Sequence, residues 1–374
     1  MQRIEQGMPI TALATPAVLV DVDILENNIK ETADAVKGHG KELWPMVKTH
    51  KSLEIAQMQH NAGASGFLCG PMEEAEMLVG RGGFKEIMLA YPVADEQNLQ
   101  RCVKLCEKAN LIFRVDSEET ATLMSEAFGK AGKSADYVIK VDVGVHRFGV
   151  EPEKIGELVK ALSKYKNLNF LGISTHPGHV YSSKSPEELK DKTLKSLEFL
   201  HTAYERLRSY GYELKMITIG STPSFQYDIE DGLVTHVHPG NYVYYDAMQV
   251  ALGTIPVERC ALTVLVAVTS RPRDLNEAAI NAGVKVFSRD VGGHEIKVVK
   301  GYGIVKGFPK AEVKLLSEEV GLIDIKEEPD MKVGEKVEII PNHSCVVNNH
   351  TSYLIGHRAG IVERLIAVDA RVGL

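Results

Sequence analysis

The amino-acid sequence predicts an α/β protein with two parts, an N-terminal (β/α)8 barrel of the TIM type and a second, mainly β domain at the C-terminus. From about Val18 to about Pro239, short strand-like segments alternate with amphipathic helical patterns. Eight such β/α units in about 220 residues match the number and length of a closed barrel. After Val250 the helical periodicity nearly vanishes, and strand-like segments separated by Gly, Pro and charged turns follow one another.

The eight expected barrel strands are Leu43–Val47, Gly66–Cys69, Glu86–Ala90, Leu111–Asp116, Tyr137–Val143, Phe170–Thr175, Lys215–Ile219 and Val234–His238. Between them, apolar residues recur at three- and four-residue spacing, as in amphipathic helices. The clearest helix-capping patterns begin at Ser117 and Ser185. A doubly wound open sheet is the alternative, but no glycine fingerprint follows the first strand, and eight units close a barrel without a remainder.

The expected strands of the second domain carry the sequences ALTVLVAVTS, VKVFSRDV, EIKVVKGYGIV, AEVKLL, EKVEIIP and ERLIAVDARV. Near the N-terminus, TPAVLVDVDI is also strand-like and precedes the first barrel helix, so it could join either domain. We place residues 25–250 in the barrel, and residues 1–24 together with 251–374 in the β domain.

The composition excludes several classes of protein. Of 374 residues, 44% are apolar and 25% are charged, which is ordinary for a globular chain and unlike a disordered chain, a collagen-like repeat or a disulfide scaffold. The net charge is 43 − 50 = −7, without a Lys/Arg block, so we expect no nucleic-acid or membrane partner. Five scattered cysteines, no secretory signal pattern and no apolar run of ~18 residues predict a cytoplasmic location.

Barrel enzymes place their active sites at the carboxyl ends of the strands. In this chain, chemically active side chains gather after strands one, five, six, seven and eight of the expected barrel. They are Lys48, Thr49, His50 and Lys51; Asp142, His146 and Arg147; His176, His179 and Tyr181; Gly220, Ser221, Thr222 and Ser224; and His238, Gly240, Asn241, Tyr242, Tyr244 and Tyr245.

Barrel closure brings two of these groups together. It places strand eight beside strand one, and the loops after strands seven and eight form the recurrent phosphate site of this fold. The turn Gly220–Thr222 can offer backbone N–H groups and hydroxyls to a dianion. Lys48 then lies one strand away, which indicates a Schiff base with pyridoxal 5′-phosphate. Taken alone, Lys48 would be read as a solvated lysine and the turn as an ordinary one.

His343 and Cys345, late in the β domain, form a second candidate site. In extended backbone, residues two apart point to one face. Imidazole and thiolate together favour zinc, and two protein ligands leave room for water or substrate, as in a catalytic metal site. The simpler alternative is a buried thiol beside a hydrogen-bonded histidine, because a two-residue pattern often occurs by chance.

Together, the segments TPAVLVDVDILENNI, MVKTHKS, VDVGVHRFGV, THPGHVY, GSTPS, HPGNYVYYDAMQ and PNHSC resemble the D-threonine aldolase and D-serine dehydratase family. The resemblance extends from about Thr15 to the C-terminus. It implies the alanine racemase fold, an N-terminal barrel with a C-terminal β domain, known as fold type III of the pyridoxal phosphate enzymes. Relatives with this fold suggest a homodimer, and the expected substrate is a small D-amino acid.

The resemblance also implies roles for individual residues. Lys48 would hold the cofactor, and its phosphate would be bound by Gly220, Ser221 and Thr222 with Gly240 and Asn241. Arg147 or Tyr181 would lie near the pyridine nitrogen, and His176 and Tyr242 complete the predicted cofactor-binding set. His343 and Cys345 would hold a divalent metal, with Zn²⁺ expected and Mn²⁺ or Mg²⁺ as alternatives. The aldolases carry a carboxylate as second metal ligand, so the thiolate of Cys345 resembles the dehydratase branch.

Three functions are compatible with these residues. The first is a metal-assisted lyase acting on D-β-hydroxy amino acids, by loss of water or by Cα–Cβ cleavage, with Lys48 as the base for the α-proton and the metal as a Lewis acid on the β-hydroxyl. The second is an amino acid racemase, which needs a second base and no metal. The third is a non-catalytic pyridoxal phosphate carrier, although such carriers are typically a lone barrel and this chain has an additional β domain.

Overall fold

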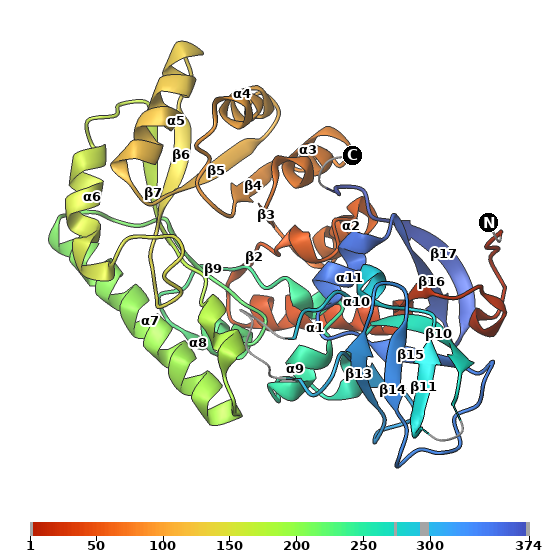
Figure 1. Ribbon diagram of the computed structural model, residues 1–374. Helices are drawn as coiled ribbons and strands as arrows, with labels where there is room; N and C mark the ends of the chain where they lie inside the picture. Colours follow the sequence, from red (N-terminus) through yellow and green to blue (C-terminus); the bar gives the residue numbers. More distant parts are fainter. Residues whose placement is uncertain (1–2, 273–274, 292–298, 372–374) are drawn as a thin grey trace.

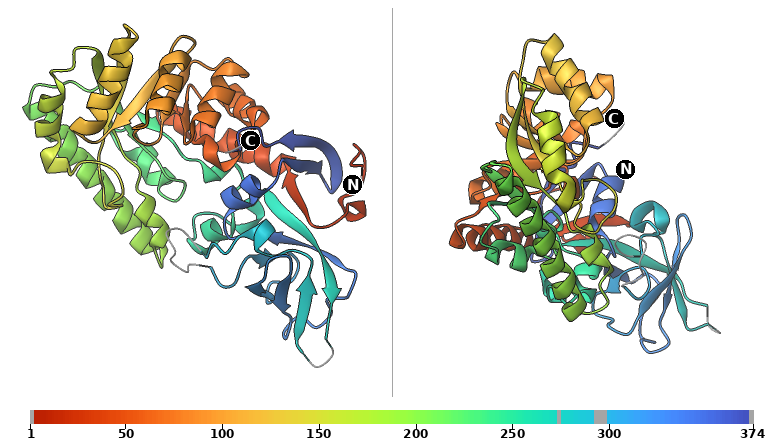
Figure 2. Two further views of the ribbon diagram at one scale, coloured as in Figure 1. Left: turned by 45° about the horizontal axis from the view of Figure 1, so that its top comes forward. Right: turned by 90° about the vertical axis from the view of Figure 1, so that its left-hand side faces the viewer.

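The computed structural model describes residues 3–272, 275–291 and 299–371. It contains two β-sheets, one of eight strands and one of nine. Figures 1 and 2 show these sheets as the centres of two lobes. Helix α1 (Val22–Gly38) joins the lobes, because it contacts β2 of the first sheet and both β1 and β16 of the second.

The eight-stranded sheet is a parallel barrel. Its strands are β2 (Glu42–Leu43), β3 (Phe67–Cys69), β4 (Glu86–Leu89), β5 (Asn110–Val115), β6 (Ala135–Lys140), β7 (Leu168–Ser174), β8 (Met216–Ile219) and β9 (His236–Val237). From β3 to β9 each strand pairs with the next, and β2 pairs with β9. A parallel bridge between Met46 and Leu68 closes the ring. The closed barrel is therefore confirmed, and the open sheet is excluded.

Helices surround the barrel: besides α1, they are α2 (Leu53–Ala62), α3 (Met72–Gly80), α4 (Glu96–Leu105), α5 (Glu118–Lys130), α6 (Ile155–Leu162), α7 (Pro186–Ser209) and α8 (Phe225–Glu230). Two begin at the predicted caps, since the hydroxyls of Ser117 and Ser185 accept hydrogen bonds from Thr120 N and Glu188 N, each at 3.2 Å. These bonds satisfy backbone groups that the first helical turn leaves free.

Side chains alternate between the two faces of each barrel strand. The outward residues pack against the helices in the main core. The inward ones form an apolar layer that fills the barrel: Trp44, Met46, Leu68, Met88, Ile112, Val138 and Met216. Gly66 must lack a side chain, because a Cβ there would lie 2.4 Å from the Trp44 ring. Two residues further along their strands, the inward positions become polar, and this change marks the floor of a pocket.

The nine strands of the second sheet are β1 (Ala17–Asp21), β10 (Leu262–Ser270), β11 (Glu277–Ile280), β12 (Ile304–Val305), β13 (Glu312–Leu316), β14 (Gly321–Asp324), β15 (Lys336–Ile340), β16 (Tyr353–Arg358) and β17 (Ile361–Ala367). Their order is β11-β14-β13-β12-β15-β10-β1-β16-β17. The N-terminal strand β1 lies between β10, which is antiparallel to it, and β16, which is parallel. The strand-like segment near the N-terminus therefore belongs to the sheet of the β domain and not to the barrel.

Two expected strands of this domain differ in the structure. The prediction for VKVFSRDV is wrong, because Val284–Phe287 is the short helix α10. Gly283 accepts a hydrogen bond from Phe287 N at 2.9 Å, and this helical turn places the Phe287 side chain in the core. Tertiary burial has overridden the strand preference of a β-branched segment. Much of EIKVVKGYGIV lies outside the described residues, and its end forms β12.

A short helix of the β domain, α11 (Ser344–His350), docks onto the barrel beside the 3-10 turn η2 (Val47–Thr49). Asn348 is buried between the lobes: its Nδ2 donates to the carbonyl of His50 at 2.9 Å, and its Oδ1 accepts from the hydroxyl of Tyr244 at 3.2 Å. In Figure 1, α11 lies next to α10, which it contacts. Among the described helices, none is long and apolar enough to cross a membrane.

Replacing Asn348 by alanine should destabilise the protein, because the His50 carbonyl and the Tyr244 hydroxyl would both lose a buried partner. A buried polar group left unsatisfied costs about 1–3 kcal/mol, so we expect a loss of about 2–4 kcal/mol in the free energy of unfolding. Urea unfolding measures this loss. The control is Asn27→Ala, whose bond to Glu31 is exposed; it should change stability by less than about 0.5 kcal/mol. Equal effects of the two substitutions would contradict the expectation.

Candidate active site

A pocket of about 1090 Å³ opens at the carboxyl ends of the barrel strands, where the β domain approaches. Its wall contains nearly all the residues predicted from the sequence. From the barrel they are Lys48, Arg147, His176, Tyr181, Gly220, Ser221, Thr222, Gly240 and Asn241, and from the β domain His343 and Cys345. The structure therefore brings the lysine, the candidate phosphate loops and the candidate metal ligands to one cavity.

Lys48 lies in η2, directly after β2. The predicted strand Leu43–Val47 is shorter in the structure, because regular pairing ends at Leu43 and is followed by the isolated bridge at Met46. The chain then turns at Val47, so Lys48 reaches the pocket from the rim of the barrel. Lys51 completes the turn in the left-handed region, with φ of 50°, and its carbonyl accepts from the backbone of Asp369 at 2.8 Å.

The loop after β8 approaches the loop after β9 closely enough to require glycine at Gly220, and Gly240 in the loop after β9 packs tightly against Met46. A Cβ on Gly220 would lie 2.6 Å from the backbone nitrogen of His238, and a Cβ on Gly240 would lie 3.0 Å from Cβ of Met46. The hydroxyl of Thr222 is buried and has no hydrogen-bond partner among the described residues. A buried donor in a glycine-lined loop fits a phosphate oxygen.

A buried chain of hydroxyls supports this loop. The hydroxyls of Ser221 and Ser224 are 2.9 Å apart, and Ser224 donates to Oδ2 of Asp228 at 2.6 Å. Burial raises the pKa of Asp228 to about 8. Asp228 was not predicted from the sequence, although it stands four residues after Ser224 on the helix that follows the loop, a spacing that brings side chains together.

The floor of the pocket is made by polar inward-facing residues, of which His176 and His238 were candidates from the sequence, whereas Arg114 and Lys140 were missed. Nη2 of Arg114 lies 3.0 Å from Nε2 of His238, and Nδ1 of His176 lies 2.7 Å from the carbonyl oxygen of Gly220. Burial, together with the neighbouring cations, lowers the pKa of both histidines well below the usual value. The pKa of the buried Lys140 is lowered by burial and by the charge of Arg114. Both histidines are therefore neutral at pH 7.

The two residues predicted near the pyridine nitrogen both line the pocket and follow neighbouring strands, β6 and β7. Arg147 follows β6 and lies over the ring of Phe148, with 5.4 Å between its guanidinium carbon and the ring centroid. Its loop is held by Asp142, whose Oδ1 accepts from the backbone of Gly144 at 2.9 Å. Tyr181 belongs to the 3-10 turn η4 (Gly178–Ser182) and is buried, and burial raises its pKa, so that its phenol is neutral.

Tyr242 is the one predicted cofactor-binding residue whose side chain the structure does not bring to the pocket. Its ring is buried beside α2, where its hydroxyl accepts from Nε2 of Gln59 at 2.9 Å. Gln59 in turn lies 3.1 Å from the ring of His50. The side chain lies away from the pocket because the chain turns into a 3-10 helix at Asn241, and Tyr242 is buried in the core.

His343 and Cys345 face the pocket, but not in the extended conformation predicted. His343 is the residue before α11, with extended φ and ψ of −139° and 102°, whereas Cys345 is in the first turn of the helix. Nδ1 of His343 lies 2.6 Å from Oδ2 of Asp290, and Sγ of Cys345 lies 3.3 Å from the hydroxyl of Thr49. Asp290 fixes the ring of His343 as second-sphere carboxylates do at metal sites.

Electrostatics favour a thiolate at Cys345. Burial alone would raise its pKa, but the adjacent His343 outweighs burial and lowers it. For His343, burial alone would lower the pKa, but Cys345 and Asp290 raise it well above its usual value. The thiolate is the form that binds soft divalent metals. No cluster of three or more His, Cys, Asp or Glu side chains arranged for a metal occurs within residues 3–272, 275–291 and 299–371.

A buried carboxylate connects the two halves of the site. Oδ2 of Asp246 accepts from Nδ2 of Asn241 at 2.7 Å and from the backbone nitrogen of Ser344 at 3.1 Å. It thereby ties the loop after β9 to the first residue of α11. Its other oxygen caps α9 (Ala247–Ala251) through Gln249 N at 3.2 Å. The spacing of Asp246 and Gln249 is a capping signal that the sequence could have provided.

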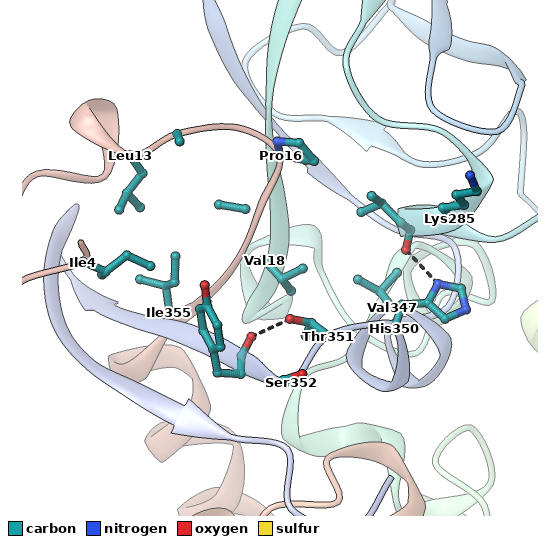
Figure 3. A pocket seen from close by; sticks show the side chains of 14 residues that line it. Ile4, Leu13, Pro16, Val18, Lys285, Val347, His350, Thr351, Ser352 and Ile355 are labelled. Atoms are coloured by element: carbon teal, nitrogen blue, oxygen red, sulfur yellow. Dashed lines mark hydrogen bonds between the residues drawn. The ribbon is translucent and has the colours of Figure 1, made fainter. Parts of the chain in front are cut away.

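A smaller cavity of about 430 Å³ lies on another side of α11, between the N-terminal segment and β16. Figure 3 shows its largely aliphatic wall, which includes Ile4, Leu13, Val18 and Ile355. Its polar side chains have local partners: Nδ1 of His350 lies 3.3 Å from a backbone carbonyl, and the hydroxyl of Thr351 donates to another at 2.8 Å. The larger pocket is therefore the candidate active site.

Comparisons with known proteins agree with this architecture. Residues 20–247 match the model of the family described as "Alanine racemase, N-terminal domain", and residues 261–356 match the serine dehydratase domain. The D-serine dehydratase of Dictyostelium discoideum is 28% identical over 372 residues, covering 91% of this chain and 93% of that protein.

Solved structures are also similar along nearly the whole chain. D-Threonine aldolase from Filomicrobium marinum superposes with a TM-score of 0.88 at 27% identity, covering 98% of both chains. A cysteine-to-alanine mutant of D-threo-3-hydroxyaspartate dehydratase in its metal-free form has a TM-score of 0.89 at 27% identity, covering 96% of this chain and 98% of that one. The chain therefore belongs to the alanine racemase-like family in which the barrel is followed by a serine dehydratase-type domain, as its motifs predict.

Proposed function

We propose that this protein is a pyridoxal phosphate-dependent, metal-assisted lyase acting on D-amino acids that carry a β-hydroxyl group. One observation carries the proposal: Lys48, the glycine-lined loops and the His343–Cys345 pair all line one pocket. The relatives described above include a D-serine dehydratase and a D-threonine aldolase, which supports this class of reaction. We propose loss of water as the main reaction and Cα–Cβ cleavage as the alternative outcome.

The residues of the pocket fit the cofactor. Lys48 would hold it covalently through Nζ, and the Thr222 hydroxyl, which lacks a partner among the described residues, would bind the phosphate together with the Gly220 and Gly240 loops. When bound, pyridoxal phosphate supplies an electron sink for the bond broken at the substrate α-carbon. The neutral imidazoles of His176 and His238 would border its ring from the floor of the pocket.

The protein's own side chains would have separate roles in this reaction. The Nζ of Lys48 takes the α-proton of the substrate, since of the lysines that line the pocket it is the one proposed to hold the cofactor. His343 and Cys345 would hold the metal, for which zinc is the proposed ion, at the wall of the same cavity. Such a metal supplies Lewis acidity that weakens the bond between the β-carbon and its hydroxyl. Asp290 orients His343, and Asp246 keeps α11 beside the loop after β9.

Replacing Lys48 by alanine should remove both cofactor attachment and turnover. We expect the wild type to be yellow and to bleach with borohydride, with the reduced cofactor found on Lys48 by peptide mass spectrometry. Lys48→Ala should lose the colour and lower the rate of keto acid formation from D-β-hydroxy amino acids by at least about 100-fold. The exposed Lys85→Ala serves as control. Reducible attachment to another lysine in Lys48→Ala would contradict the assignment.

Removing the metal should abolish elimination while the cofactor stays bound, because none of its proposed contacts is a metal ligand. Chelation and Cys345→Ala should have the same effect, and metal content and keto acid formation are measured on the same samples. Metal occupancy should also fall at low pH, since the imidazolium of His343 and the thiol of Cys345 must both lose a proton before they can bind the metal. Full turnover on a β-hydroxy D-amino acid without metal would contradict the metal-assisted mechanism and favour a racemase or a metal-free lyase.

The role of Asp290 can be tested separately. Asp290→Asn should weaken metal binding by about 10- to 100-fold, as loss of an outer-sphere carboxylate does, without removing a ligand. Isothermal titration with Zn²⁺ measures the affinity. Asp231→Asn is the matched control, because Asp231 pairs with the exposed His201 at 2.7 Å outside the pocket. A zinc affinity equal to wild type in Asp290→Asn would contradict the proposed metal site.

We also propose a homodimer, which sedimentation at assay concentrations tests. A fully active monomer would exclude a site shared between subunits.

A further inference from the structure

Two hydroxyl groups connect a buried carboxyl group to the candidate phosphate loop at Gly220–Thr222. The carboxyl group belongs to Asp228 on α8, which is completely buried. Its Oδ1 has no hydrogen-bond partner among the described residues, whereas its Oδ2 lies 2.6 Å from the hydroxyl of Ser224. The Ser224 oxygen lies 2.9 Å from the hydroxyl of Ser221, which lines the pocket. The three side chains therefore form one hydrogen-bonded chain from the core to the pocket.

The protonation state of Asp228 sets the direction of every bond in this chain. An ionised carboxylate can only accept, so the single proton of the Ser224 hydroxyl goes to Oδ2, and Ser221 must donate to Ser224. The Ser221 oxygen then presents only lone pairs to the pocket, and these repel a phosphate oxygen. A neutral Asp228 can instead donate to Ser224, and Ser224 to Ser221, which frees the Ser221 proton for a phosphate oxygen.

The surroundings of Asp228 favour its neutral form. Burial raises its pKa to about 8, opposed by the hydrogen bond from Ser224, and the charge of Asp231 raises it further. Helix α8 packs against α7 and β9. On α7, His201 pairs with Asp231 at 2.7 Å, and on β9 burial lowers the pKa of His236 to about 4, so that its ring is neutral. Asp228 is therefore neutral at pH 7 and ionises as the pH rises past 8.

We propose that Asp228 is a positioning residue that holds a proton for the phosphate site and thereby, through Ser224, turns the hydroxyl of Ser221 toward a phosphate dianion. At pH 7 the dianion meets a chain that already has this direction. With Asp228 ionised, a phosphate monoanion reaches the same state by passing its proton to Ser221, while Ser221 passes its own to Ser224 and Ser224 to Oδ2 of Asp228. Three O–H bonds break and three form, so no other reactant is needed. This inference deepens the proposed function and rests on it, because its ligand is the phosphate of the cofactor.

The test measures how much the phosphate group contributes to binding at each pH. The full-length protein, freed of cofactor, is titrated calorimetrically with pyridoxine 5′-phosphate, which has no aldehyde and cannot bond covalently to Lys48. Pyridoxine, which lacks the phosphate, is titrated in parallel. In the wild type, the ratio of the two affinities should fall about 10-fold between pH 7.5 and 9, because Asp228 loses its proton over this range while the phosphate is already a dianion.

Asp228→Asn should abolish this fall. Its amide nitrogen can donate to Ser224 at every pH, so Ser221 continues to donate to the phosphate. At pH 9 this variant should therefore bind pyridoxine 5′-phosphate about 10-fold more tightly than the wild type does. Glu230→Gln is the matched control, because it removes an exposed carboxylate from the same helix, and it should keep the pH dependence of the wild type.

The proposal is overturned if the affinity ratio of the wild type is the same at pH 7.5 and 9, or if Asp228→Asn shows the wild-type fall. A loss of the fall in Glu230→Gln also overturns it. If Asp228→Asn does not fold, Ser224→Ala decides, because Ser221 then no longer depends on Asp228; a fall equal to that of the wild type overturns the proposal. A wild type that binds both ligands equally at every pH refutes the phosphate site itself, whereas a preference for the phosphate without pH dependence refutes only the role of Asp228.

Discussion

The contact between η2 and α11 sets the geometry of the whole site. The three residues that follow Lys48 each bind a different residue of this helix: the hydroxyl of Thr49 contacts the thiol of Cys345, the carbonyl of His50 accepts from Asn348, and the ammonium of Lys51 donates to Asn349. The amine of Lys48 in one domain and the candidate metal ligands His343 and Cys345 in the other are thereby placed in one cavity. These bonds are buried or partly buried, so they help to hold the two domains together at the site.

Buried basic side chains form part of the floor of the same pocket. Arg114 and Lys140 are buried cations, and burial lowers the pKa of Arg114 to about 9. Such groups are costly to bury unless an anion compensates them. A phosphate and the carboxylate of an amino acid would supply that compensation, which agrees with a pocket that receives two anionic groups. The barrel thus provides the positive floor, and the β domain provides the thiolate and the imidazole.

Much of this could be predicted from the sequence, and the failures have physical causes. The barrel followed from the number and period of its segments, and closure alone placed Lys48 near the Gly220 and Gly240 loops. The approach of Cys345 to Lys48 depends on how the second domain docks, which periodicity does not encode. Arg114 and Lys140 could have been found, because they occupy inward positions two residues beyond Ile112 and Val138. Asp290 could not have been found from the sequence, since only the fold of α10 and the loop after it brings Asp290 to His343.

The position of β1 has a consequence for biosynthesis. A chain emerging from the ribosome can close the barrel once β9 has been made, but β1 must wait for both of its neighbours, β10 and the late strand β16. Until then its edges are open, and contacts so distant in sequence form slowly. Helix α11, which carries the candidate metal ligand Cys345, precedes β16 directly, so the candidate site is completed only after the whole barrel has been made. A shortened chain lacking β16 would expose an edge of β1 to pairing with other chains.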